Sequence, residues 1–218
     1  MTHSRSVVPV FCTLLLASCA GLGTAAIPET APVRPPASER PRTPESSPVP
    51  ERPPAPELIL GKGRIESEQL AGFLLKNNAG AEAGFARTLA VLYIEECAAE
   101  GVNHDVAFVQ MCHETGFLRY GGLVTPDMNN FCGLGSIGPG QPGERFSSAR
   151  IGVRAHIQHL KGYASDAPLK GELVDPRYRW IKYGSAPSIH DLTGRWASDR
   201  EYGNKLSAIL ERLYSFAL

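Results

Sequence analysis

The sequence has no excess charge of either sign, because its 22 basic and 22 acidic side chains cancel. A balanced chain lacks the strongly basic surface of a protein that binds nucleic acid through bulk charge, and it is not an acidic disordered tail. Its N-terminal apolar stretch, Val7 to Ala17, would form roughly 16 Å of helix, about half of a bilayer core. The five cysteines include no Cys-x-x-Cys pair of the kind found in structural zinc sites.

Proline is abundant in one stretch only: 11 of the 18 prolines fall between Pro28 and Pro56. Such a density excludes helix interiors and central strands, since proline lacks an N–H and restricts the residue before it. The stretch has no aromatic residue either, so it cannot bury enough surface to offset the entropy of ordering. We therefore expect a signal peptide at 1–18, a disordered Pro-rich linker at 19–58 and one domain at 59–218, which is long enough for its own core.

The N-terminal segment is typical of an export signal. Arg5 precedes the apolar stretch, which ends in Leu16-Ala17-Ser18-Cys19. This tetrapeptide resembles the bacterial lipobox, whose cysteine is acylated and becomes the mature N-terminus. The resemblance implies a lipid anchor at Cys19 and a place in the cell envelope, at the outer membrane facing the periplasm because Ala20 follows. The alternative is an ordinary signal peptide cut after Ala26, which would discard the cysteine.

Apolar residues recur at helical spacing through most of the domain, so we expect a mainly α (α+β) fold. Residues 117–146 break the pattern with seven glycines and three prolines, which predicts a long loop with at most a small hairpin. The expected helices begin at Ser67, near Phe85, after Asn103, after Ser148 and after Asp199, with a short additional helix that starts near Ser188 and reaches Trp196.

Glu114 has the most informative position in the sequence. It falls in the last turn of a helix that Gly116 ends. A carboxylate there faces the negative end of the helix dipole, which costs about 0.3–1 kcal/mol relative to a cation. The same field, with apolar Met111 and Phe117 nearby, favours the neutral acid and raises its pKa, as a general acid at neutral pH requires.

Three segments occur in an informative order: Cys112-His113-Glu114-Thr115-Gly116-Phe117, Asn129-Asn130-Phe131-Cys132-Gly133-Leu134-Gly135, and Trp196-Ala197-Ser198-Asp199-Arg200-Glu201-Tyr202-Gly203. Together they resemble the bacterial glucosaminidases of glycoside hydrolase family 73, which cleave the glycan strands of peptidoglycan. The resemblance covers residues 66–216. It implies a lysozyme-like helical body with a small β-lobe, and hydrolysis of β-1,4 bonds next to N-acetylglucosamine.

The resemblance also implies roles for individual residues. Glu114 matches the catalytic acid, and Asn130 and Phe131 match the loop that lines the substrate cleft. Tyr202 matches the tyrosine of the late motif, and Trp196 stands where many members have tyrosine. An indole there can still stack on a sugar ring and donate through its N–H.

The second catalytic group has two candidates. Glu144 follows Glu114 by thirty residues, and some family members place a second glutamate at a similar distance. The alternative is that Glu144 is a polar loop residue and that the substrate's own N-acetyl group is the nucleophile, a route known among glycosidases.

Other chemistries have weaker support. His156 and His159 share a helix face, but no third ligand stands at a metal-site spacing, so we expect no metal and no cofactor. A cysteine peptidase would need a thiolate at a helix N-terminus, whereas Cys112 lies near a helix C-terminus and Cys132 in a loop. Together with Cys97 these residues allow one disulfide or three buried thiols.

The expected partners are peptidoglycan strands and, through the anchor, a membrane; no nucleic acid is expected, and the chain should be a monomer. The rival interpretation is a catalytically inactive wall-binding or scaffolding lipoprotein on the same fold.

Overall fold

The computed structural model describes residues 57–218. The predicted signal peptide, Cys19 and nearly all of the predicted linker lie outside these residues. In the described part no helix is long and apolar enough to cross a membrane. The mainly helical class is confirmed by five α-helices: α1 (Ser67–Asn77), α2 (Ala83–Glu100), α3 (His104–Glu114), α4 (Ala149–Ala164) and α5 (Tyr202–Ala217). Three short 3-10 helices accompany them: η1 (Pro126–Met128), η2 (Tyr178–Trp180) and η3 (His190–Leu192).

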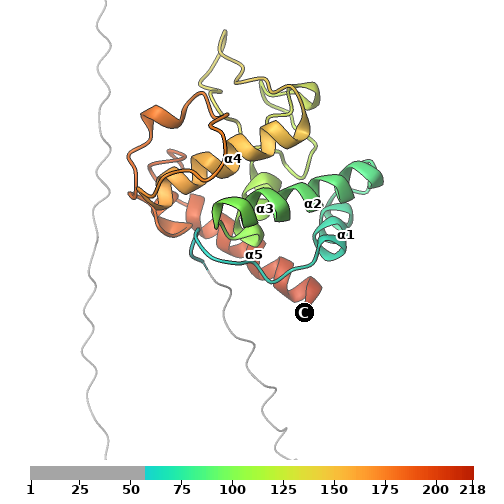
Figure 1. The fold of residues 1–218 in the computed structure, drawn as a ribbon. Helices are drawn as coiled ribbons and strands as arrows, with labels where there is room; N and C mark the ends of the chain where they lie inside the picture. Colours follow the sequence, from blue (N-terminus) through green and yellow to red (C-terminus); the bar gives the residue numbers. More distant parts are fainter. Residues whose placement is uncertain (1–56) are drawn as a thin grey trace, which may run out of the picture. The chain divides into compact units, whose positions relative to one another are not determined.

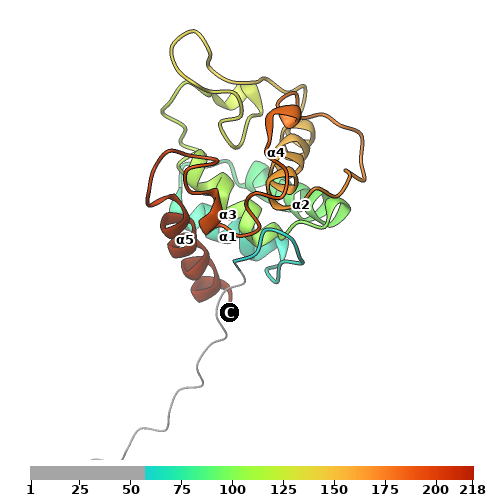
Figure 2. The same ribbon diagram turned by 90° about the vertical axis from the view of Figure 1, so that its left-hand side faces the viewer.

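The helices form one body around a shared apolar core. Helix α2 packs against α1, α3 and α4, and α5 packs against α3 and α1. In both ribbon views the glycine-rich segment between α3 and α4 extends from the end of the body away from α5 (Figures 1 and 2). The segment leaves the helical body at the end of α3, whose last residue is Glu114.

The helix boundaries follow from their end residues. The Asn103 side chain accepts a hydrogen bond from the Asp105 N–H at 3.0 Å and so caps α3. Ser148 caps α4 in the same way, and Gly101 ends α2 in the left-handed conformation that glycine adopts without strain. Helix α5 begins at Tyr202, after a turn in which the Asp199 carboxylate accepts a hydrogen bond from the Glu201 N–H at 3.0 Å.

The segment 117–146 is a long loop, as expected, and its pairing is limited to a single bridge between Gly138 and Gln141; the described residues contain isolated bridges but no strand. One local expectation needs correction. The short helix expected to reach Trp196 ends at Leu192. Trp196 lies instead in a turn, where Gly194 has φ +74° and donates its N–H to Ala197 O at 2.8 Å. A left-handed glycine cannot continue a right-handed helix, so the turn begins there.

The insertion is held against α4 by a close backbone contact. Gly152, in the first turns of α4, faces the carbonyl of Asn129, and a Cβ built on Gly152 would lie 1.7 Å from that oxygen. Asn129 itself is left-handed, with φ 51°, and its side chain donates to Phe146 O at 3.1 Å. The loop that carries Asn130 and Phe131 therefore takes its position from a helix face that has no side chain at this point.

We predict that Gly152→Ala destabilises the protein although alanine is the better helix former by about 0.8–1 kcal/mol. The added methyl group overlaps the Asn129 carbonyl, and overpacking of this kind costs about 1–3 kcal/mol. Gly72→Ala in α1 is the matched control, because its Cβ would meet only the Phe216 ring at 3.4 Å, and it should be neutral or stabilising. Thermal unfolding measures both, and a Gly152→Ala protein as stable as the Gly72→Ala protein would contradict the contact.

Candidate active site

Glu114 is the last residue of α3 and lies at the junction of α3, α5 and the glycine-rich segment. Its side chain is largely buried, and the Tyr202 hydroxyl at the start of α5 donates a hydrogen bond to its Oε1 atom. A pocket of about 260 Å3, called here the acid pocket, opens beside it. This pocket is lined by Glu114, Thr115, Tyr120, Gly122, Leu123, Val124, Asn130, Gly133 and Ser136.

The pKa of the Glu114 carboxyl is raised above its ordinary value. Burial is the largest cause, because removal from water disfavours the charged carboxylate. Hydrogen bonding from Tyr202 and Trp196 acts in the opposite direction and offsets only part of the burial. The sequence also predicts a raised pKa for this carboxyl, and in the structure the main cause is burial of the side chain. A raised pKa gives Glu114 the character of a proton donor.

The turn that follows Glu114 is strained. Phe117, Leu118 and Tyr120 have φ angles of 57°, 63° and 57°, in the left-handed region that costs a non-glycine residue about 1–2 kcal/mol. Hydrogen bonds hold them there: Asn78 donates to Phe117 O at 2.8 Å, and the Leu118 N–H donates to Thr115 Oγ1 at 2.9 Å. This conformation turns the chain sharply after α3 and places Tyr120 in the wall of the acid pocket.

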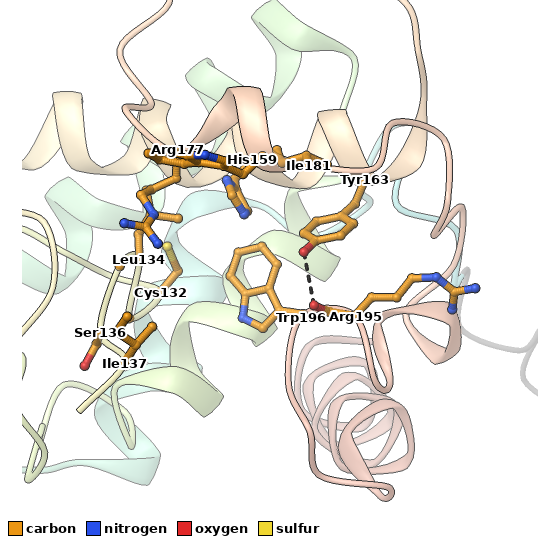
Figure 3. Close-up of a pocket in the computed structure, with 13 residues that line it drawn as sticks. Cys132, Leu134, Ser136, Ile137, His159, Tyr163, Arg177, Ile181, Arg195 and Trp196 are labelled. Atoms are coloured by element: carbon orange, nitrogen blue, oxygen red, sulfur yellow. Dashed lines mark hydrogen bonds between the residues drawn. The ribbon is translucent and has the colours of Figure 1, made fainter. Parts of the chain in front are cut away.

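A second pocket of about 330 Å3, called here the aromatic pocket, lies on the other side of the glycine-rich loop. The half-buried Trp196 indole forms part of its wall and packs on His159 and Tyr163, with ring centroids 5.1 and 5.9 Å away. Figure 3 shows Trp196 between these α4 side chains and the loop residues Cys132 and Ser136. The Tyr163 hydroxyl donates to Arg195 O at 3.1 Å, which fixes the turn that carries Trp196.

The two pockets meet at the loop, since Gly133 and Ser136 line both of them. Asn130 holds this loop: its side chain accepts from the Leu134 N–H at 3.0 Å and donates to Leu134 O at 2.9 Å and to Glu144 O at 3.0 Å. Gly133 is left-handed, with φ 68°, and a Cβ there would lie 3.7 Å from Glu114 Oε2. The loop therefore passes close to the acid without covering it with a side chain.

The structure brings together some of the residues predicted from sequence and separates others. Glu114, Tyr202 and Trp196 form one cluster. Tyr202 is 2% exposed, so its hydroxyl serves Glu114 and not the open cleft. Asn130 touches the acid pocket, but it is fully buried and its amide is used within the loop. Asn130 therefore stabilises the conformation of the loop through hydrogen bonds to the backbone of Leu134 and Glu144.

Two predicted residues lie elsewhere. Phe131 has no exposed surface and packs in the core against Phe85, with ring centroids 6.3 Å apart, so its expected place on the cleft wall is corrected to a core position. Glu144 lines neither pocket; its carboxylate lies over Gly135 and 3.7 Å from the Arg177 guanidinium. Among the residues that line the two pockets, Glu114 is the one with an acidic side chain.

The weaker chemistries gain no support from the geometry of residues 57–218. No group of three His, Cys, Asp or Glu side chains in this range could hold a metal ion. Cys97, Cys112 and Cys132 are buried free thiols, which decides the alternative between one disulfide and none in this structure. Burial raises the pKa of the Cys112 and Cys132 thiols, so neither has the thiolate character of a peptidase nucleophile.

Sequence reasoning missed several side chains of the site. Tyr163, Arg177, Trp180 and Arg195 all line the aromatic pocket. Trp180 is 59% exposed, and the guanidinium groups of Arg177 and Arg179 lie 4.6 and 4.3 Å from its ring centroid. The run Arg177-Tyr178-Arg179-Trp180 was a possible signal, because arginine and aromatic residues alternate in it.

Comparison with known proteins identifies the family of this chain. The family described as Glucosaminidase, mannosyl-glycoprotein endo-beta-N-acetylglucosaminidase, matches residues 90–215, which include Glu114, the glycine-rich segment and Tyr202. The chain belongs to the glucosaminidase family. This confirms the resemblance read from the three sequence segments, and it places the chain among the glycoside hydrolases.

Two individual proteins are similar to this glucosaminidase-family chain. A protein of Borreliella burgdorferi described as uncharacterized is 41% identical over 158 residues, which cover 72% of this chain and 78% of that protein. Among solved structures, autolysin E of S. aureus, in complex with the muropeptide NAM-L-Ala-D-iGlu, matches with a TM-score of 0.46 and 12% identity, covering 73% of this chain and 71% of that one.

We predict that Glu114→Gln stabilises the glucosaminidase domain near neutral pH. A carboxyl whose folded pKa is raised contributes stability below its unfolded pKa, about 4.3, and loses that contribution as the pH rises through the folded value. The glutamine variant should therefore have the higher melting temperature at pH 7, and its advantage should shrink towards pH 4. Thermal unfolding between pH 4 and 8 tests this. Glu211→Gln, at an exposed position of α5, is the control and should show little change. An advantage that grows on acidification would contradict the assigned pKa direction.

Proposed function

We propose that this protein is a peptidoglycan hydrolase that cleaves β-1,4 glycosidic bonds next to N-acetylglucosamine, with Glu114 as the general acid. The observation that carries the proposal is the buried Glu114 carboxyl, which has a raised pKa and borders the acid pocket. A neutral carboxylic acid at the working pH can protonate the glycosidic oxygen as the bond to the anomeric carbon breaks. Family membership supports the proposed bond class, since the family's description is that of an endo-acting N-acetylglucosaminidase.

The two connected pockets suit an extended polysaccharide. Sugar rings have apolar faces that pack on aromatic side chains, and Trp196, Tyr163 and the exposed Trp180 all line the aromatic pocket. We propose that a strand crosses the Gly133 loop, with the bond to be cleaved beside Glu114 and the neighbouring sugars against Trp196. The indole N–H of Trp196 then stays on the Glu114 side, where it already affects the carboxyl.

Charge in the aromatic pocket favours an anionic glycan over a neutral one. Arg177 and Arg195 contribute the guanidinium groups of its wall, and no acidic side chain lines it. Glu144, 3.7 Å from Arg177 and outside the pocket, offsets part of the Arg177 charge, so Arg195 is the one of these two guanidinium groups without a carboxylate partner among the described residues. Peptidoglycan carries carboxylates on the peptide stems of alternate sugars, whereas a plain N-acetylglucosamine polymer is uncharged. The export signal predicted from the sequence points to the same polymer, because it would deliver the enzyme to the compartment that holds the cell wall.

For the second catalytic group we propose the substrate's own acetamido oxygen, with Glu144 as the alternative. Both common two-carboxylate mechanisms need a second carboxylate about 5 to 9.5 Å from the acid, on the other side of the bond. Glu144 lies outside both pockets and close to Arg177, and Glu114 is the one acidic side chain that lines them. The acetamido group is carried by the sugar itself, so this mechanism needs no nucleophile from the protein. It agrees with a site in which Glu114 is the one acidic side chain that lines the two pockets.

We predict that Glu114→Gln lowers turnover of purified sacculi by about a hundredfold to ten-thousandfold, the usual contribution of a positioned acid. Glutamine keeps the shape and can still accept the Tyr202 hydrogen bond, but it cannot release a proton. Mass spectrometry of the released muropeptides identifies the new reducing ends and therefore the bond that is cleaved. A Glu114→Gln protein that releases N-acetylglucosamine ends at the wild-type rate would remove Glu114 as the acid.

Glu144→Gln is the matched control for that experiment, since it makes the same chemical change thirty residues away. With the acetamido group as nucleophile, this variant should stay within severalfold of wild-type turnover. A loss as large as that of Glu114→Gln would assign the second role to Glu144. If the wild-type protein binds sacculi but releases no reducing ends, the rival interpretation of an inactive wall-binding protein on the same fold is correct.

We also propose that Cys19 carries a lipid anchor and holds the domain at the outer membrane. The support is the Leu16-Ala17-Ser18-Cys19 sequence after an apolar stretch, and this part of the chain lies outside the described residues. Cys19→Ser should move the protein from the membrane fraction to the soluble fraction or leave its precursor unprocessed, as fractionation and intact-mass measurement would show. Unchanged mass and partitioning would contradict acylation.

A further inference from the structure

A chain of four hydrogen bonds, three of them buried and the last partly buried, ends at the Glu114 carboxyl. The Tyr202 hydroxyl donates to Glu114 Oε1, and Gln110 Nε2 donates to the Tyr202 oxygen at 2.8 Å. The opposite end of the Gln110 amide, Oε1, lies 2.9 Å from His156 Nε2, and His156 Nδ1 lies 2.9 Å from the Tyr93 hydroxyl. The chain crosses the core through α2, α4, α3 and α5, and its members before Glu114 are at most 2% exposed.

With the Gln110 amide oriented as in the structure, the chemistry of the other members gives the chain one direction. An amide has a donor end and an acceptor end, so Gln110 can donate to Tyr202 only while it accepts from His156. His156 must then carry its single proton on Nε2, and its Nδ1 must accept from Tyr93. Because the Tyr202 oxygen already accepts from Gln110, its own proton goes to Glu114. Every hydrogen bond therefore donates towards the carboxyl.

We propose that Gln110, His156 and Tyr93 are positioning residues, which act through Tyr202 to keep Oε1 of Glu114 an acceptor and so leave its acidic proton on Oε2. The inference rests on the proposed role of Glu114 as the acid. Oε2 is the oxygen near Gly133, the glycine at which the two pockets meet. A carboxyl with its proton on Oε1 would direct that proton into the core, away from any glycosidic oxygen in the pocket. The chain thus selects the productive arrangement of the acid.

The surroundings of His156 fit this role. Burial, with the nearby His159, lowers the pKa of His156 to about 3, so the ring stays neutral and keeps one donor and one acceptor nitrogen. An imidazolium would donate from both nitrogens and would break the link to Tyr93. The chain therefore holds its direction over the whole pH range in which the enzyme would work.

The same chain affects the pH at which Glu114 loses its proton. Donation from Tyr202 stabilises the ionised carboxylate and opposes the effect of burial, so a weakened chain should raise the pKa of Glu114. Other titratable groups near the carboxyl are Tyr202, Cys132, Tyr120 and, against the Tyr202 ring, His113. Burial raises the pKa of the first three and lowers that of His113, which itself is affected by Lys205 and Asp199. We therefore expect the fall of kcat/KM at alkaline pH, called here the alkaline limb, to report the loss of the proton from Glu114.

The first experiment needs no variant and no activity: nitrogen-15 NMR of His156 in the intact protein. We expect a neutral ring protonated at Nε2 from pH 5 to 9. Protonation at Nδ1 would mean that the chain runs away from Glu114, and an imidazolium would mean that it is broken; either result overturns the proposal.

The second experiment measures the alkaline limb of kcat/KM in Tyr93→Phe and Gln110→Met. Tyr93→Phe keeps the ring and removes the first donor, so the limb should move up by a few tenths of a pH unit. Gln110→Met leaves Tyr202 without its donor, and the shift should approach about one pH unit with a fall in kcat. Tyr214→Phe is the matched control, because that hydroxyl donates to Asp105 at 2.5 Å in a separate buried network on α5.

A purely structural chain would give a different pattern. Tyr93→Phe and Gln110→Met would then lower the melting temperature as Tyr214→Phe does and leave the limb where it is. The carboxyl pKa of Glu114, followed by carbon-13 NMR in the same variants, gives the same test without turnover. An inactive wild-type protein whose Glu114 pKa still rises in the variants would refute the proposed function and keep the chain, whereas an active protein with an unmoved pKa would refute the chain alone.

Discussion

The hydrogen bond from the Tyr202 hydroxyl to Glu114 is the interaction on which the rest of the site depends. It joins the end of α3 to the beginning of α5, two helices that are separated in the sequence by the glycine-rich segment, α4 and the turn of Trp196. A carboxyl at a helix C-terminus opposes the helix dipole, and burial adds a desolvation cost. The hydroxyl donor is what lets a carboxyl occupy this place, and the packing of α5 on α3 brings that donor to it.

Burial and hydrogen bonding act on Glu114 in opposite directions, and the balance between them has a functional meaning. Burial alone would make the carboxyl a weak acid that releases its proton poorly, while strong donation alone would leave it ionised at neutral pH. The structure combines the two, with one oxygen bound to Tyr202 and the other near Gly133 at the meeting point of the pockets. A glycine at that point matters because any side chain there would stand between the acid and a ligand.

The sequence predicts the helices well and the site in part. Helix ends depend on local chemistry, and Asn103 and Ser148 act at the positions where the pattern places them. Phe131 and Glu144 were assigned by resemblance, whereas their actual places depend on how the loop packs on Gly152 and Arg177, contacts that spacing does not encode. Gln110 and His156 interrupt apolar helix faces, a sign of buried hydrogen bonds. Gln110 is 46 residues from its partner His156, and His156 is 63 residues from its partner Tyr93, so no local pattern identifies these pairs.

Several features that lower stability gather around one pocket. Glu114 is a largely buried carboxyl at the wrong end of a helix, and three non-glycine residues in the turn that follows the helix are left-handed. A scaffold that only bound the wall would be more stable with a cation at position 114 and a relaxed turn after it, since nothing in binding requires a neutral acid. The hydrogen bonds that hold the strained turn and the directed chain behind Tyr202 both stabilise this costly arrangement. Strain that is supported from two sides at the same carboxyl favours the enzyme over the scaffold, because a neutral acid can protonate a glycosidic oxygen and has no comparable use in binding alone.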